Sequence, residues 1–174
     1  NHLYKTTNRA EDWKLLTDYE FGKNSDYITA ISISSYNENI LYVGTNNGGI
    51  YKIKDSLGIV TVTDISPSFL SKRIRTITIA PDNSDDIMIG SDAGWENAGI
   101  IQSMDGGNSW NVISKGIEKG TINRLKYIPN EPNCVLAAHS NGLYYSVDNG
   151  ENWSKVSGFP NVEVWDFAFS VLKN

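Results

Sequence analysis

The chain has 174 residues and a formal net charge of -5, from 15 Lys and Arg against 20 Asp and Glu. This length suffices for one domain with a core, and a hydrophobic content of 40% is typical of a globular chain. The lack of basic excess argues against nucleic-acid binding, and no apolar run is long enough to span a membrane. With two His and one Cys, a multi-histidine metal site is excluded, and we expect no metal and no cofactor.

The sequence pattern predicts strands along almost the whole chain, because β-branched and aromatic residues are separated by short polar clusters. Two strands are expected near residues 2–6 and 13–17. A pattern of three strands then recurs three times: an alternating strand, a second apolar strand, and a short strand that follows a glycine. The alternating strands are 28–33, 74–79 and 122–128, and the segment 162–169 has the same pattern. A fourth strand follows each tryptophan of the motif described next.

A short polar motif also repeats along the chain. Ser103–Trp110 and Ser146–Trp153 both read S-x-D-x-G-x-(S/N)-W. Thr6–Trp13 is a worn copy in which Asn8 replaces the aspartate, and Ile53–Gly58 keeps little beyond Asp55. The four copies begin at residues 6, 53, 103 and 146. Four strands in roughly 45 residues is the period of a β-propeller blade, a four-stranded sheet repeated around an axis.

The motif resembles the Asp-box, or BNR repeat, of sialidases, sortilin-type receptors, xyloglucan-cleaving glycoside hydrolases and photosystem assembly factors. The resemblance implies an all-β propeller of four-stranded antiparallel blades. We expect a partial blade at 1–20, blades at 27–66, 73–117 and 121–158, and the first strand of a further blade at 162–174.

The motif has a physical logic as a turn between the third and fourth strands. Its aspartate accepts main-chain N–H groups of the turn, its glycine supplies positive φ, and its tryptophan packs into the blade. Asp105 and Asp148 occupy equivalent places in different blades, which argues against a catalytic pair. We therefore predict structural roles for Asn8, Trp13, Asp55, Ser103, Asp105, Gly107, Trp110, Ser146, Asp148, Gly150 and Trp153.

The expected strands are one short of four blades. In one interpretation the chain is a piece of a larger propeller. In the other, its two ends share a composite blade, completed by the last residues or by a second chain. Either way the open edges predict partners, since unpaired strand edges associate readily.

In propellers that carry the motif, ligands bind at the loops on the opposite face. Carried over, this face would hold Arg73, Asp92, Trp95, Glu96, Arg124, His139 and Trp165. Trp95 between carboxylates suits sugar stacking and hydroxyl binding. The alternative is that these loops are ordinary solvated turns.

The resemblance is compatible with binding and with catalysis. We expect a non-catalytic module that binds a protein or a glycan or serves as a scaffold. The alternative is a fragment of a glycoside hydrolase acting on polysaccharide, which needs two carboxylates roughly 5–9.5 Å apart. Asp92 or Glu96 would be one of them. A sialidase site is not expected, because the family's first arginine motif is missing. The resemblance implies a secreted, periplasmic or cell-surface protein.

Overall fold

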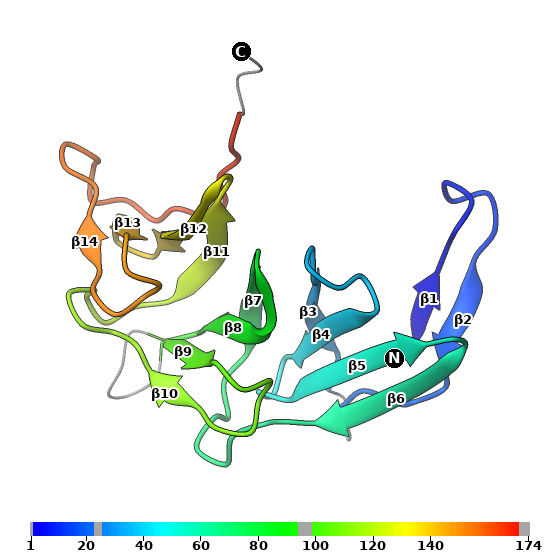
Figure 1. The fold of residues 1–174 in the computed structure, drawn as a ribbon. Helices are drawn as coiled ribbons and strands as arrows, with labels where there is room; N and C mark the ends of the chain where they lie inside the picture. The colour runs from blue at the N-terminus through cyan, green and yellow to red at the C-terminus, as the bar shows by residue number, and fades with distance from the viewer. Residues whose placement is uncertain (1, 23–25, 94–98, 171–174) are drawn as a thin grey trace.

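The computed structural model describes residues 2–22, 26–93 and 99–170, and this part of the chain contains strands and no helix. It forms one two-stranded and three four-stranded sheets, all antiparallel, and the strands of each sheet follow one another in sequence order (Figure 1). The predicted all-β architecture of four-stranded blades is confirmed. The two-stranded sheet contains β1 (Leu3–Lys5) and β2 (Lys14–Thr17).

Each four-stranded sheet is one blade. The first blade contains β3 (Ile28–Ile33), β4 (Ile40–Thr45), β5 (Ile50–Ser56) and β6 (Ile59–Asp64). The second contains β7 (Ile74–Ala80), β8 (Asn83–Ser91), β9 (Ile100–Ser103) and β10 (Asn111–Val112). The third contains β11 (Ile122–Ile128), β12 (Glu131–His139), β13 (Gly142–Ser146) and β14 (Ser154–Lys155).

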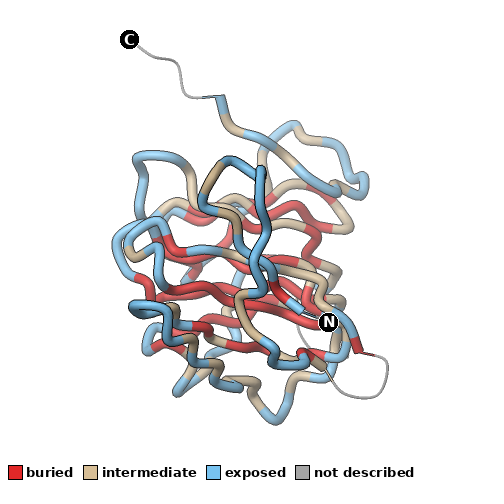
Figure 2. Tube along the Cα trace, turned by 90° about the vertical axis from the view of Figure 1, so that its right-hand side faces the viewer, coloured by how far each residue is buried: buried red, intermediate tan, exposed pale blue. Residues whose placement is uncertain are grey.

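The hydrophobic core lies between the blades rather than within any one of them. Ile40, Tyr42 and Ile50 of the first blade share one cluster with Ile74 and Ile77 of the second. Met88 and Ile100 of the second blade likewise pack with Ile122 and Leu125 of the third. The buried segments accordingly run through the middle of the molecule, with the exposed turns around them (Figure 2). The first strands β3, β7 and β11 lie beside one another, although they are not hydrogen-bonded as a sheet.

Two glycines allow the blades to approach closely. Gly44 and Gly90 are the last but one residues of the second strands of their blades and face Ile74 and Ile122 of the next blade. A Cβ on Gly90 would lie 2.6 Å from Ile122 Cγ2, which is closer than real side chains come. The tight contact between neighbouring blades therefore depends on glycine at these positions, because glycine has no side chain.

The repeated polar motif forms the same hydrogen-bonded turn in three places. Asp105 Oδ1 accepts the Ser109 N–H at 2.9 Å and the Ser103 hydroxyl at 2.8 Å. Ser103 Oγ in turn accepts the Gly107 N–H at 2.7 Å, and Gly107 has a φ of 99°. Ser146, Asp148 and Gly150 repeat these bonds.

The worn copy at the N-terminus makes the same turn with different residues. Thr6 Oγ1 accepts the Ala10 N–H and Asn8 Oδ1 accepts the Asp12 N–H, both at 3.0 Å. Arg9 and Ala10 have positive φ without being glycines. A hydroxyl and a carbonyl oxygen therefore suffice for the turn, even where the aspartate and the glycine are lost.

The tryptophans of the motif join neighbouring blades. Trp110 Nε1 donates to the Ile65 carbonyl at 2.9 Å, and Trp153 Nε1 donates to the Ile113 carbonyl at 3.1 Å. Both acceptors lie at the end of the preceding blade, so these indoles do more than pack into their own blade. Trp13 differs from the prediction, because 59% of its surface is exposed.

The structure overturns two expectations about the motif and the strands. Asp55 makes no such turn: it lies within β5, opposite Val60, and pairs with Lys5 at 2.8 Å, because Leu57 and Gly58 close a two-residue hairpin instead. Residues 162–170 form no strand, since nothing described supplies a second ladder beside them. Residues 171–174 of that expected strand lie outside the described residues.

Candidate functional site

The candidate site lies at the ends of the blades opposite the motif turns. There the loop after each second strand is bonded to the residue before each first strand. The bonds run from Asp92 N–H to the Arg73 carbonyl at 3.1 Å and from Ser140 N–H to the Thr121 carbonyl at 3.0 Å. These bonds bring loops that are far apart in sequence to one surface.

Arg75 is the centre of a polar cluster on this surface. It is the second residue of β7, after Ile74. Its Nε contacts the Asp92 carboxylate, and its NH1 donates to Asn123 Oδ1 of β11 at 3.1 Å. Asn123 Nδ2 reaches Glu163 Oε1 at 3.2 Å and the Val164 carbonyl at 2.9 Å. We refer to Arg75, Asp92, Asn123, Glu163 and Trp165 as the Arg75 cluster.

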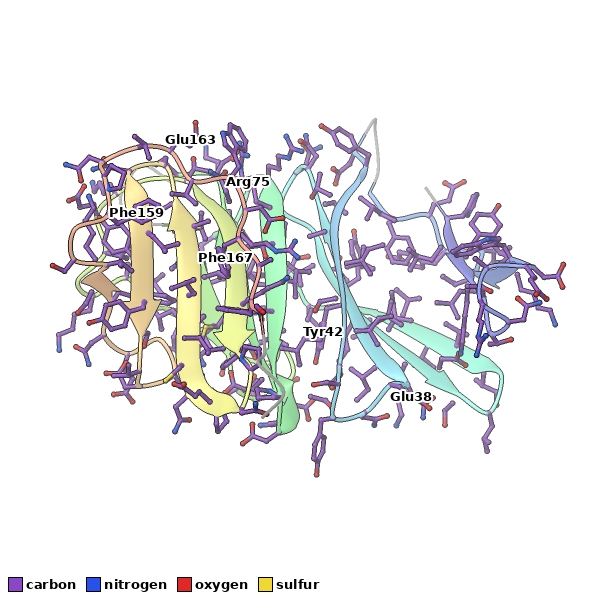
Figure 3. All side chains as sticks on the ribbon, turned by 90° about the horizontal axis from the view of Figure 1, so that it is seen from above. Glu38, Tyr42, Arg75, Phe159, Glu163 and Phe167 are labelled. Atoms are coloured by element: carbon purple, nitrogen blue, oxygen red, sulfur yellow. The ribbon has the colours of Figure 1, made fainter. Side chains whose placement is uncertain are left out.

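An exposed indole completes this cluster. The Trp165 ring lies 5.7 Å from the Arg75 guanidinium carbon, a cation–π distance, and 62% of Trp165 is exposed. The backbone of the segment is held by Val164, whose N–H donates to the His139 carbonyl at 3.0 Å. Arg75 and Glu163 lie at the same end of the molecule, away from Glu38 (Figure 3).

The cluster adjoins a polar groove between the first strands. The groove has a volume of about 260 Å³ and is lined by residues of β3, β7 and β11, among them Arg75 and Arg124. Arg124 Nε lies 3.4 Å from Asp166 Oδ1, which is an ion pair rather than a short hydrogen bond. Two arginines from neighbouring blades therefore line one groove, and each has a carboxylate beside it.

Some of the predicted ligand residues lie in or beside the Arg75 cluster, and others do not. Asp92 and Trp165 belong to the Arg75 cluster and Arg124 lies beside it, while Arg73 is exposed and contributes its carbonyl. Trp95 and Glu96 lie outside the described residues.

His139 is fully buried and is not presented to a ligand from the surface. Its Nδ1 accepts the Asn141 N–H at 2.9 Å, and its ring meets the Tyr144 ring edge-on at 5.1 Å between centroids. Burial lowers the pKa of His139 below its usual value, and a neutral imidazole fits this accepting role. Its place supports the turn to Asn141.

Arg75, Asn123 and Glu163 belong to the loops and strand starts of the predicted face, but they are not among the seven residues chosen there as ligand contacts. Arg75 is the second residue of β7 and Asn123 is the second residue of β11. The first strands lie beside one another, so the second residue of one first strand is close to the second residue of the next. The recurring strands already show that these residues are equivalent, because Thr29, Arg75 and Asn123 each follow the first isoleucine of an alternating strand. Thr29 Oγ1 donates to the Ile74 carbonyl at 2.6 Å, as Asn123 does to that of Val164.

The chemistry available in the cluster is polar recognition beside an aromatic surface. It offers a guanidinium, an amide and two carboxylates in one hydrogen-bonded chain, with an exposed indole beside the guanidinium. Among the described residues, no three His, Cys, Asp or Glu side chains group closely enough to hold a metal ion. No helix in the described part of the chain is long and apolar enough to cross a membrane.

Similar proteins are found by sequence and by structure. No protein-family model matches the chain. The xyloglucanase of Hypocrea jecorina (strain QM6a) is 26% identical over 167 residues, which cover 86% of this chain and 20% of that protein. A xyloglucanase of a Paenibacillus species is 24% identical over 157 residues, covering 80% of this chain and 15% of that protein. The chain thus spans a fifth or less of these curated relatives.

Solved structures place the fold among β-propellers. An ancestral GH74 enzyme superposes with a TM-score of 0.68 at 21% identity, covering 89% of this chain and 21% of that one. The GH74 enzyme of Niastella koreensis gives 0.66 at 20% identity, covering 87% and 26%. YCF48 bound to D1 peptide gives 0.56 at 17% identity, covering 84% and 48%. At such identities the likeness concerns the fold.

Proposed function

We propose that this chain is part of an Asp-box β-propeller that binds a polysaccharide, with the Arg75 cluster as its contact surface. The observation that carries the proposal is the exposed Trp165 indole, held beside Asp92, Asn123 and Glu163. Sugar rings present C–H faces that pack on an indole and hydroxyls that pair with carboxylates and amides. The similarity to xyloglucanases makes xyloglucan the first ligand to test, and it favours a secreted protein.

We favour binding over catalysis because both carboxylates of the cluster already have partners within the chain. Asp92 is engaged by the Arg75 guanidinium, and Glu163 accepts from Asn123. A hydrolase needs one carboxyl to donate a proton and a second to attack or to activate water. Asp92 would have to leave Arg75 before it could serve in either role.

The test is binding of the purified 174-residue chain to xyloglucan by affinity electrophoresis and calorimetry. Removing the indole in Trp165→Ala is expected to weaken binding roughly tenfold, because stacking and its buried area contribute on the order of 1.4 kcal/mol. Tyr36→Ala is the matched control, since Tyr36 is 67% exposed and lies on the turn between β3 and β4. Equal binding by both variants would remove the Arg75 cluster from the proposal.

Glycoside hydrolysis is the second candidate, supported by the sequence similarity to xyloglucanases. Under the leading proposal, the chain binds xyloglucan and releases no new reducing ends. If reducing ends appear and Asp92→Asn or Glu163→Gln abolishes them, the hydrolase reading replaces the binding reading. Peptide binding, as in the YCF48 complex, is a third outcome, indicated if a peptide competes with xyloglucan for the Trp165 surface.

A further inference from the structure

The first blade has a face that is only half covered. β1 and β2 cover its outer part, where Leu3 and Leu16 pack with Leu41, Val43 and Ile53. Its inner part opens into a hollow of about 560 Å³. We call this space the β3 hollow; its apolar lining includes Leu3, Leu16, Ile31, Ile33 and Leu41.

Repeat positions show what normally covers such a face. Ile31 and Ile33 of β3 are 52% and 62% exposed. The equivalent Ile77 and Ile79 of β7 are 7% and 8% exposed, because Ile40 and Tyr42 of the preceding β4 pack against them. The exposure of Ile31 and Ile33 therefore reflects a missing second strand in front of β3, and the β3 hollow continues the interface that joins the other blades.

The edge of β1 gives the position of that missing strand. β5, β9 and β13 are third strands, and each is bonded on both sides, whereas β1 pairs with β2 alone in the described part of the chain. In the first blade Gly44 lies opposite Ile50 and Tyr42 opposite Lys52; in the second blade Gly90 lies opposite Ile100 and Met88 opposite Gln102. The turn that the N-terminal sheet shares with the second blade matches Thr6 with Ser103, and so aligns Leu3 with Ile100 and Lys5 with Gln102. Through the positions opposite Gly44 and Gly90, Leu3 then corresponds to Ile50 and Lys5 to Lys52.

We propose that the β3 hollow receives an antiparallel β-hairpin from outside these 174 residues, bonded to the free edge of β1. Its second strand carries a large apolar residue opposite Lys5 and a glycine opposite Leu3. The large residue covers Ile31 and Ile33, as Tyr42 covers Ile77 and Ile79. The glycine admits Ile28, which is half-buried, whereas its equivalents Ile74 and Ile122 are fully buried. The order large–β-branched–glycine is that of Tyr42-Val43-Gly44 and Met88-Ile89-Gly90.

The experiment uses a fluorescent peptide with the sequence of residues 73–92, which contains the β7–β8 hairpin. Anisotropy titration against the intact 174-residue chain is expected to give saturable binding. The Ile33→Asp chain is expected to bind at least tenfold more weakly. Ile59→Asp, at a 70% exposed isoleucine on the outer strand β6, is the matched control and should bind like the unmodified chain. Circular dichroism confirms that each variant is folded.

The glycine requirement distinguishes a specific seat from general apolar adhesion. The peptide carrying Gly90→Val is expected to lose binding, because its new side chain would collide with Ile28. Equal binding of both peptides, or no binding to the folded chain, overturns the proposal. Fusing the hairpin ahead of residue 1 through a flexible linker provides a second measurement, and an unchanged melting temperature of the fusion also counts against it. A dimer that Ile33→Asp dissolves in sedimentation would show that a second copy occupies the hollow, which likewise overturns the proposal.

Discussion

At the scale of residues, the turns of the repeated motif depend on a few buried oxygen atoms. Ser146 Oγ accepts the N–H groups of Gly150 at 2.9 Å and Asp148 at 3.3 Å and donates to Asp148 at 2.8 Å. A single hydroxyl thus satisfies main-chain donors that the turn would otherwise leave unpaired.

Ser146→Ala is expected to lower the free energy of unfolding by about 1–3 kcal/mol, since buried donors lose their acceptor. Urea unfolding followed by circular dichroism measures the loss. Ser157→Ala, at an exposed serine, is the control and should stay within about 0.5 kcal/mol of the unmodified chain. Similar stabilities for the two variants would show that Ser146 is dispensable.

The motif aspartates predict a dependence of stability on acid. The Ser109 side chain and N–H and the Ser103 hydroxyl lower the pKa of Asp105 to about 2, and hydrogen bonds from Asn152 and Ser146 lower the pKa of Asp148. Since the pKa of an unfolded aspartate is about 3.9, the stabilisation is complete above that pH and is lost as pH falls toward 2.

Asp105→Asn is therefore expected to be less stable than the unmodified chain at pH 6, with the difference narrowing below about pH 4. Denaturant unfolding across pH 2–6 measures both chains. A constant difference over that range would mean that ionisation of Asp105 contributes nothing to the turn.

At the scale of elements, the sequence was informative where copies align and misleading where they do not. The three blades and the β1–β2 pair follow from the recurring apolar strands. The fourth motif copy was misleading: Asp55 matches by position, yet Leu57-Gly58 forms a two-residue hairpin with φ of 53° and 82°. Such a hairpin depends on two adjacent residues in the left-handed region, and leucine rarely adopts that conformation.

This hairpin can be improved. Leu57 is fully exposed with a positive φ, so Leu57→Asn is expected to raise the free energy of unfolding by about 0.5–1 kcal/mol. Thermal unfolding should show a rise of roughly 1–4 °C. Leu57→Val is the opposite control, because a β-branched residue tolerates positive φ least. A lower melting temperature for Leu57→Asn would contradict this account of the turn.

At the scale of the whole molecule, the contacts between blades are what the sequence could not supply. The Arg75 cluster joins β7, β11 and the segment after the third blade, and its members are distant in sequence. Residue types and loops suggested Asp92, Arg124 and Trp165, but which arginine meets Asp92 depends on how the blades pack. Periodicity within one strand carries no information about the neighbouring blade.

Packing between blades also predicts the cost of filling Gly90. A Cβ there would lie 2.6 Å from both Ile122 Cγ2 and Thr76 Cγ2. Gly90→Ala is expected to destabilise the chain by about 1–3 kcal/mol in urea unfolding, because the blades must separate to admit a methyl group. Ala138→Gly, at the equivalent position of the third blade, is the control, with a loss of about 0.5–1 kcal/mol from backbone flexibility alone. Unchanged stability of Gly90→Ala would show that the interface between the second and third blades can accommodate the methyl group without cost.

The indoles of Trp110 and Trp153 both donate to a carbonyl of the preceding blade, so these contacts between blades point the same way along the chain. In the second and third blades the motif tryptophan is bonded to the preceding blade, so separating it from that blade exposes its indole to water. Such an assembly behaves as a row of nearest-neighbour couplings rather than as a single block. Opening can then begin at either end and proceed one interface at a time, and the emission of Trp110 and Trp153 would record the order of opening.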